Sequence, residues 1–198
     1  MQTFLLATQN PDKVEEIKAI LSDVPFNIKS LIDISGLPEV VEDGNTLEEN
    51  ALKKGRIIFE ATGLPCLADD TGLEVFCLDM RPGVYSARYA GDHVSYDDNN
   101  RKLLAELQEV TDISNRGARF RCVAAFVGKD IEKITVGICH GAIGFEPHGT
   151  GGFGYDPLFI PKGYIQTFAE LSPEVKNRIS HRAKAFQLMR KLLISHFK

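Results

Sequence analysis

The chain has 198 residues, of which 43% are hydrophobic, and it carries a formal net charge of -4 with a pI near 5.8. This length and apolar content suffice for one large core, so we expect a single domain over residues 1–198. An acidic chain has no general attraction for polyanions, which argues against nucleic acid as a partner. Any phosphate group must therefore be bound by lysines and arginines that cluster locally.

The cysteines and the hydropathy indicate a compartment. Cys66, Cys77, Cys122 and Cys139 all lie in apolar, strand-like segments and none belongs to a CxxC motif. We therefore expect reduced core thiols rather than disulfides or a zinc site. The sequence shows no charged leader before an apolar segment and no apolar run that would span a bilayer. A cytoplasmic protein without membrane contact is the expectation.

A strand and a helix are predicted at the start of the chain. The apolar run at residues 4–7 predicts the strand, and apolar residues at helical spacing over residues 14–21 predict the helix. Asn10 is placed to cap this helix and Pro11 suits its first turn. The amide donors of the helix N-terminus would then point outward beside Thr8 and Asn10.

Lys13 is the unusual residue of this helix. A cation in the first turn opposes the helix dipole, and an anion shared between Lys13 and the free amides would offset that cost. The alternative is a solvated face on which Asp12, Glu15 and Glu16 balance Lys13. The residues alone favour neither interpretation.

A second helix is predicted from the capping box at residues 46–49 to Gly63 and Pro65, after an irregular stretch with an acidic cluster that includes Glu42. We interpret that cluster as solvated loop charges. Asn50 and Lys54 lie one turn apart on the apolar face of the helix, which indicates that they line a cavity and reach an acid or a phosphate. Alternatively, they stand at the edge of the face and the lysine snorkels to water.

Two adjacent carboxylates, Asp69 and Asp70, follow the next apolar run. The run at residues 64–68 predicts a short buried strand that ends in the two acids and in Thr71-Gly72. Ionised carboxylates leave water only when hydrogen bonds, cations or a metal compensate them, so the pair is a candidate hard-cation or acid-base site. A turn in which Asp serves as a cap is the alternative.

The middle of the chain is predicted to continue with a strand at 73–78, a turn at Pro82-Gly83, a helix over 95–110 and a hairpin of long strands around residues 128–130. Arg88 lies between two tyrosines and presents a fork that suits a phosphate. A salt bridge to a neighbouring Asp would satisfy it equally well.

Residues 149–157 contain a literal GxGxxG. The dinucleotide-binding form of this motif opens a helix, whereas here Pro157 and the apolar residues after it predict a strand, so we reject that interpretation. A glycine loop with an aromatic and an acid instead suits a flat ligand, with Phe153 stacked on it and Asp156 accepting from a ring N–H. A merely flexible loop is the alternative.

The last helical region is predicted to begin at Ser172-Pro173-Glu174 and to run to about residue 195. Lys176, His181 and Arg182 gather near its front. Basic residues gathered near a helix start indicate an anion or an electron-rich ring edge.

Six segments in chain order together resemble one family, the inosine/xanthosine triphosphate pyrophosphatases, also called dITP/XTP diphosphatases. They are TQNPDK at 8–13, Glu42 followed by T-x-x-E-N-A-x-x-K at 46–54, ADDTGLEV at 68–75, PGVYSARYAG at 82–91, GTGGFGYDPLF at 149–159 and SHR at 180–182. Small departures are Gln9 where a glycine is common, Thr71 for a frequent serine, and Met80-Arg81 before Pro82. None removes a chemical group that the reaction needs.

The resemblance implies an α/β fold, elongated and two-lobed around a long mixed β-sheet with flanking helices, with the active site in the central cleft. It implies a cytoplasmic, Mg²⁺-dependent homodimer that hydrolyses deaminated purine nucleoside triphosphates (ITP, dITP, XTP) to the monophosphate and pyrophosphate. These small molecules would be its substrates.

The resemblance also assigns the site. Glu42 and Asp70 would ligate Mg²⁺, and Asp70, Lys13 and Asp69 would form the catalytic group, although strand alternation keeps Asp69 from facing the metal with Asp70. The expected triphosphate ligands are Thr8, Gln9, Asn10, Lys13, Lys54, Thr71 and Arg88. The expected purine ligands are Phe153, Gly154, Tyr155, Asp156, Lys176, His181 and Arg182.

Two rival functions fit parts of the sequence. A nucleotide-binding regulator would keep Phe153 and Lys13 without needing Glu42 and Asp70. A member of the septum-associated nucleotide pyrophosphatases would share the architecture and prefer modified pyrimidine triphosphates, but would lack FGYD and SHR.

Overall fold

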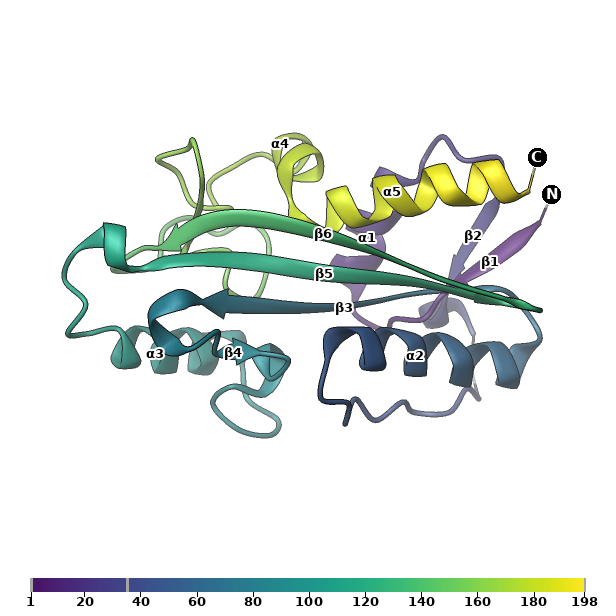
Figure 1. Cartoon of the computed structure of the whole chain (residues 1–198), viewed down its shortest axis with the longest axis horizontal. Helices are drawn as coiled ribbons and strands as arrows, with labels where there is room; N and C mark the ends of the chain where they lie inside the picture. The colour runs from purple at the N-terminus through teal and green to yellow at the C-terminus, as the bar shows by residue number, and fades with distance from the viewer. Residues whose placement is uncertain (1, 35, 198) are drawn as a thin grey trace. The chain divides into compact units, whose positions relative to one another are not determined.

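The computed structural model describes residues 2–34 and 36–197. Its central feature is a mixed β-sheet in the order β2-β1-β3-β5-β6-β7, with β4 paired to β3 (Figure 1). The strands are β1 Thr3–Leu6, β2 Asn27–Ser30, β3 Cys66–Val75, β4 Pro82–Gly83, β5 Gly117–Gly128, β6 Ile131–Ile143 and β7 Phe159–Pro161. β1 pairs in parallel with both β2 and β3, while β4 and β7 pair antiparallel. The predicted mixed α/β fold is confirmed.

The helices are interspersed among these strands along the chain. They are α1 Pro11–Ile20, α2 Leu47–Thr62, α3 Tyr96–Glu106, α4 Pro173–Ile179 and α5 His181–His196. The predicted caps are present: Asn10 accepts from the Asp12 and Lys13 amides, Thr46 and Glu49 form a capping box, and Gly63 ends α2 in the left-handed conformation. Among the described residues, none of these helices is long and apolar enough to cross a bilayer.

The chain divides into two compact units, each with its own hydrophobic core. The first unit comprises Met1–Asp70, Cys122–Gly137 and His181–Lys198, and the second comprises Thr71–Arg121 and Ile138–Ser180. That both units belong to a single domain, as expected from the sequence, stays a prediction.

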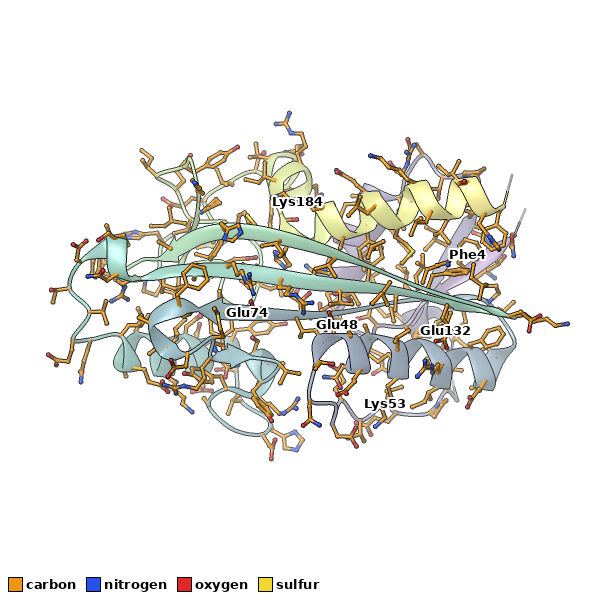
Figure 2. The ribbon with its side chains drawn as sticks, in the orientation of Figure 1. Phe4, Glu48, Lys53, Glu74, Glu132 and Lys184 are labelled. Atoms are coloured by element: carbon orange, nitrogen blue, oxygen red, sulfur yellow. The ribbon has the colours of Figure 1, made fainter. Side chains whose placement is uncertain are left out.

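In the first unit, helices cover both faces of the sheet. Figure 1 shows α1 and α5 on one face and α2 on the other. Leu67 packs with Val14 of α1 and Phe186 of α5, whereas the Cα of Gly55 in α2 approaches the opposite face, where an added Cβ would lie 3.9 Å from Cβ of Ala68. Phe4, labelled in Figure 2, belongs to the α1–α5 core. Alternate residues of β3 therefore face different helices.

In the second unit, α3 packs against residues of β3, β5, β6 and β7. Its core contains Leu73, Leu103, Phe120, Phe159 and Phe168. Arg116 is buried, and its guanidinium donates to the carbonyls of Leu107, Val110, Ile143 and Gly144. These bonds connect the end of α3 to the end of β6, just before the glycine loop.

Four expectations about local structure are corrected. β3 is one continuous strand, so the two acids lie within it rather than at a strand end before a turn. The last helical region is broken at Ser180, which is extended with φ -66° and ψ 161°, giving α4 and α5. Residues 27–30 form β2 within the stretch expected to be irregular. Cys77 is exposed rather than a core thiol, since it lies in a short 3-10 turn after β3.

Candidate active site

Asp69 and Asp70 lie side by side in β3, and both are buried. Because side chains alternate along a strand, the two carboxylates point to opposite faces of the sheet. Asp69 faces α1 and α5, and Asp70 faces α2. The two faces of the strand therefore carry two separate clusters in the first unit, here called the Asp69 cluster and the Asp70 cluster.

The Asp70 cluster consists of Asp70, Asn50, Lys54 and Glu42. Nδ2 of Asn50 donates to Oδ2 of Asp70 at 3.0 Å. Nζ of Lys54 lies 3.0 Å from Oε1 of Glu42 and 3.7 Å from Oδ1 of Asp70. The prediction that Asn50 and Lys54 reach an acid from the apolar face of α2 is confirmed. Glu42 is not a solvated loop charge, because its carboxylate is an ion-pair partner of the buried Lys54.

The pKa values in this cluster follow from burial and from an incomplete balance of charge. Burial raises the pKa of Asp70 to about 6; Lys54 opposes this rise and the Glu42 carboxylate adds to it. Burial also disfavours the ionised form of Glu42, but Lys54 and Lys13 outweigh it and lower the pKa of Glu42. For Asp70, Lys54 and the weaker effect of Lys13 do not offset burial and the Glu42 carboxylate, so Asp70 holds a proton into the weakly acidic range.

The Asp69 cluster consists of Asp69, Lys13, Arg182 and Glu16. Oδ2 of Asp69 lies 3.3 Å from Nζ of Lys13, and Nε and Nη2 of Arg182 donate to it at 3.3 and 3.2 Å. Nη1 of the same guanidinium donates to Oε2 of Glu16 at 2.5 Å. α1 supplies Lys13 and Glu16, β3 supplies Asp69, and the first turn of α5 supplies Arg182.

In the Asp69 cluster, the attraction of the two cations outweighs the effect of burial on the carboxylate. Burial disfavours the Asp69 carboxylate, yet Lys13 and Arg182 hold its pKa well below the usual range. Burial likewise disfavours the Arg182 guanidinium, and Asp69 and Glu16 more than offset that and raise its pKa. Asp69 is therefore ionised at any pH at which the protein would work, and it is held by two cations.

The turn before α1 is organised by its own polar groups. The Asn10 amide donates to Oγ1 of Thr8 at 3.2 Å, and Oδ1 of Asn10 accepts from the Asp12 and Lys13 amides at 2.9 and 3.2 Å. Two of the amides that we expected to point outward are thus capped. Gln9 is exposed between Thr8 and Asn10.

The second unit brings together Phe153, Asp156 and Lys176. Nζ of Lys176 lies 4.9 Å from the centroid of the Phe153 ring and forms a buried ion pair with Oδ2 of Asp156. The same Oδ2 accepts from the Phe153 amide at 2.9 Å. Asp156 therefore fixes the backbone of the glycine loop and the position of Lys176, and Phe153 keeps a half-buried ring beside that ammonium.

The remaining predicted ligands are dispersed. In the second unit, Tyr155 is buried and its hydroxyl donates to the Ser86 carbonyl at 2.9 Å, Gly154 accepts from Asn100, and Arg88 lies over the Tyr85 ring at 5.2 Å. Thr71 is half-buried in β3. His181 and Arg182 begin α5 in the first unit, whereas Lys176 belongs to α4 in the second. The role of Arg182 at the purine edge stays a prediction, and its described partners are Asp69 and Glu16.

Sequence reasoning missed two contributors. Glu16 was assigned at most a solvated role, because its partner Arg182 lies 166 residues further along the chain. Gly44 was treated as punctuation only. Its amide donates to Oδ1 of Asn50 at 2.8 Å, and an added Cβ would lie 2.6 Å from that oxygen, so the loop that carries Glu42 is drawn onto α2 there.

The donor set of the Asp70 cluster fits Mg²⁺ bound together with a substrate. Within residues 2–34 and 36–197, no group of three or more His, Cys, Asp and Glu side chains is arranged to hold a metal by itself. Mg²⁺ commonly takes one or two carboxylates and completes its shell with waters and phosphate oxygens. Glu42 and Asp70 would supply the carboxylates, and a cation bound there would offset the negative charge that Lys54 shares between them.

Comparisons with known proteins agree with this arrangement of motifs. The Ham1 family matches residues 4–192. The dITP/XTP pyrophosphatase of Geobacter sulfurreducens is 50% identical over 96% of this chain and 96% of its own, and that of Bacillus subtilis is 44% identical over 98% of each. Among solved structures, a HAM1 protein from Coxiella burnetii superposes with a TM-score of 0.89 at 38% identity, covering 98% of this chain and 100% of its own. This chain therefore belongs to the Ham1 family.

Proposed function

We propose that this protein hydrolyses the deaminated purine nucleoside triphosphates ITP, dITP and XTP to the monophosphate and pyrophosphate, and that the reaction requires Mg²⁺. The Asp70 cluster carries this proposal. It places two carboxylates around one buried lysine and keeps one of them protonated near pH 6. A site with that deficit of positive charge suits a divalent cation that would bind together with the triphosphate. The names of the relatives, dITP/XTP pyrophosphatases, support the substrate class.

At the phosphates, the residues of the first unit would divide the work. Mg²⁺ held by Glu42 and Asp70 would neutralise phosphate charge as water attacks the α-phosphorus. Lys54, 3.0 Å from Glu42, keeps the two carboxylates in place and offers one cation to the triphosphate. Lys13 and the capped turn at Asn10 are positioned at the start of α1 for the outer phosphates. Asp70 would also accept the proton of the attacking water, although bound Mg²⁺ would lower its pKa from the metal-free value of about 6 and make it a weaker base.

In the second unit, Phe153 and Lys176 would recognise the base. Phe153 offers a ring for stacking, and Lys176 offers donors but no acceptor. A 6-oxo group accepts from such a donor, whereas the 6-amino group of adenine leaves it unpaired. An unpaired buried donor costs about 1–3 kcal/mol, which corresponds to roughly ten- to a hundredfold discrimination against ATP.

The proposal includes the homodimer and the ligand roles of Thr8, Gln9, Thr71, Arg88 and His181, which are carried over from the family resemblance. It also includes a cytoplasmic location, which is expected from the cysteines. Light scattering of the purified protein tests the dimer, since a monomeric mass at micromolar concentration would contradict it. Fractionation of cells that produce the protein tests the location.

A substrate panel tests the function. The protein is incubated with ITP, dITP, XTP, GTP, ATP and a methylated pyrimidine triphosphate, and monophosphate and pyrophosphate are quantified with Mg²⁺ and with EDTA. We expect equal amounts of both products from the deaminated purines, much slower turnover of ATP and GTP, and no turnover in EDTA. Release of orthophosphate, preference for the methylated pyrimidine, or activity in EDTA would each contradict the proposal in a distinct way.

A further inference from the structure

Glu16 takes part in a linear chain of ion pairs that ends at Lys13. Glu16 binds Nη1 of Arg182, the other side of the same guanidinium binds Oδ2 of Asp69, and that oxygen also contacts Nζ of Lys13. All four residues belong to the first unit. Lys13 and Glu16 are one helical turn apart on α1, so the chain leaves this helix and returns to it through β3 and α5.

The members of this chain differ in their access to solvent. The side chains of Asp69 and Arg182 are 0% and 2% exposed, and those of Glu16 and Lys13 are 13% and 17% exposed. Two carboxylates and two cations alternate, so the group is neutral as a whole. Lys13 is at the open end and is the only one of the two cations that an incoming anion can reach without displacing buried side chains.

We propose that Glu16 is a positioning residue that sets how tightly Lys13 is held by Asp69, and thereby how readily Lys13 turns to the triphosphate. This inference rests on the proposed function, in which Lys13 binds phosphate. Glu16 draws part of the charge of Arg182 away from Asp69. Asp69 therefore keeps enough negative charge to hold Nζ of Lys13 at 3.3 Å.

The physical reason is competition for a single oxygen. Lys13 and both nitrogens of Arg182 converge on Oδ2 of Asp69. If Glu16 lost its charge, Arg182 would direct its whole charge to that oxygen and weaken the hold on Lys13. Lys13 would then bind phosphate more easily in the ground state, but without the anchor that fixes its orientation. Tighter ground-state binding without an equal gain in the transition state lowers both KM and kcat.

The test is the isosteric variant Glu16→Gln, assayed with ITP and Mg²⁺. We expect KM to fall by about 3- to 10-fold, equivalent to about 0.7–1.4 kcal/mol, and kcat to fall by a similar factor, which lies within the usual coupling of charged networks. A role confined to folding would lower the melting temperature and the active fraction, but it would not lower KM. In the Lys13→Met background, Glu16→Gln should leave KM unchanged. In the otherwise wild-type protein, Glu16→Asp keeps the carboxylate, so its KM should lie closer to the wild-type value than that of Glu16→Gln.

The chain offers a matched control. Asp23 follows α1 and accepts from Nε of Arg190 on α5 at 2.8 Å, so it also pairs the α1 region with α5, but on the surface and away from Asp69. Asp23→Asn should leave KM and kcat at the wild-type values. An unchanged or raised KM for Glu16→Gln, or the same fall in KM for Asp23→Asn, would overturn the inference.

A binding experiment tests this inference independently of the proposed function. Calorimetry measures the affinity of the protein for inorganic tripolyphosphate in the absence of metal. Glu16→Gln should bind tripolyphosphate about 3- to 10-fold more tightly than the wild type, again from the magnitude of network coupling. A wild type that binds tripolyphosphate but leaves ITP intact would contradict the proposed function and leave the role of Glu16 standing. Equal tripolyphosphate affinity in both proteins would contradict the role of Glu16, whatever the activity on ITP.

Discussion

Asp69 and Asp70 are neighbours in one strand, but their surroundings differ in the sign of the excess charge. On the α1–α5 face, Asp69 meets two cations, and their combined charge outweighs burial and lowers its pKa. On the α2 face, Asp70 and Glu42 share Lys54, and burial raises the pKa of Asp70 to about 6. The same residue type at the same depth is thus a fixed anion on one side and a proton acceptor near neutrality on the other.

The difference shows that the two faces of one strand can hold a carboxylate that stabilises the fold and a carboxylate that is suited to react. A fully compensated buried carboxylate holds elements together, and breaking such a pair is costly. An undercompensated one destabilises the folded protein until a proton or a metal ion binds, and such perturbed groups are common at functional sites. By this criterion we propose that Asp69 supports the site and that Asp70 takes part in the reaction. The following changes test that division.

The largest effect is expected on turnover from Asp70→Asn. This change removes a proposed magnesium ligand and the proposed base but keeps the shape and an oxygen that can accept from Asn50. We expect kcat on ITP to fall by about 10³- to 10⁴-fold, or about 4–5.5 kcal/mol. Near-normal turnover with Mg²⁺ would show that the reactive carboxylate has been assigned to the wrong face of β3.

The next largest effect is expected on stability from Asp69→Asn. Removing one partner from a buried network typically costs about 3–5 kcal/mol, because Arg182 would keep a buried charge without its carboxylate. Urea denaturation at pH 7 measures the change. The exposed pair of Arg190 with Asp23 provides the comparison, since Arg190→Met breaks a pair that water and salt screen and should cost far less. A loss for Asp69→Asn no greater than that of the surface variant would contradict the supporting role.

Much of the fold was predictable because its signals are local. Asn10 and Pro11 at the start of α1, the capping box at Thr46 and the two-residue link between β5 and β6 all act within a few residues. The break at Ser180 was missed, since the residues on both sides of it keep helical patterning. β2 was missed because its four residues do not alternate strongly and rely on pairing with β1.

The candidate site was predictable in its residue types and less so in its partners. The side chains of Asn50 and Lys54 were recognised on the apolar face of α2 because polar residues there need a buried partner. The pairing of Lys13 with Asp69, and of Arg182 with Glu16, joins segments far apart in sequence, and local patterns do not encode it. For the same reason, the role of Glu16 emerged only from the coordinates.

The two aspartates should also differ in how they make the stability of the protein depend on pH. This effect is expected to be smaller than those above. The pKa of Asp70 is raised from 3.8 to about 6, so its contribution favours the folded state below pH 3.8 and is lost as the pH rises through 6. Without metal, Asp70→Asn should therefore stabilise the protein by about 1–3 kcal/mol at pH 8 and have little effect below pH 4. The pKa of Asp69 is lowered, so its stabilising contribution is present above pH 3.8 and is lost only as the pH falls through the lower, folded-state value.

Urea denaturation of the wild type and of both variants between pH 4 and pH 8 gives these curves. The difference between Asp70→Asn and the wild type should grow with pH, whereas the Asp69→Asn difference should be constant from pH 5 to pH 8. A Mg²⁺ titration at pH 8 serves as a control, because the ion should stabilise the wild type more than Asp70→Asn. Parallel curves for the two variants would remove the distinction between the two faces.

The smallest effect is expected from Gly44→Ala, which acts on the Asp70 face only. A Cβ at this position would lie 2.6 Å from Oδ1 of Asn50, so the loop that carries Glu42 must move away from α2. A displacement of one carboxylate should raise the Mg²⁺ concentration for half-maximal activity by about 2- to 10-fold, equivalent to about 0.5–1.5 kcal/mol. Asn45→Ala, at the exposed next position, should leave that concentration unchanged. An unaltered Mg²⁺ requirement in Gly44→Ala would mean that Glu42 does not depend on this contact, and the metal would then have to rely on Asp70 alone.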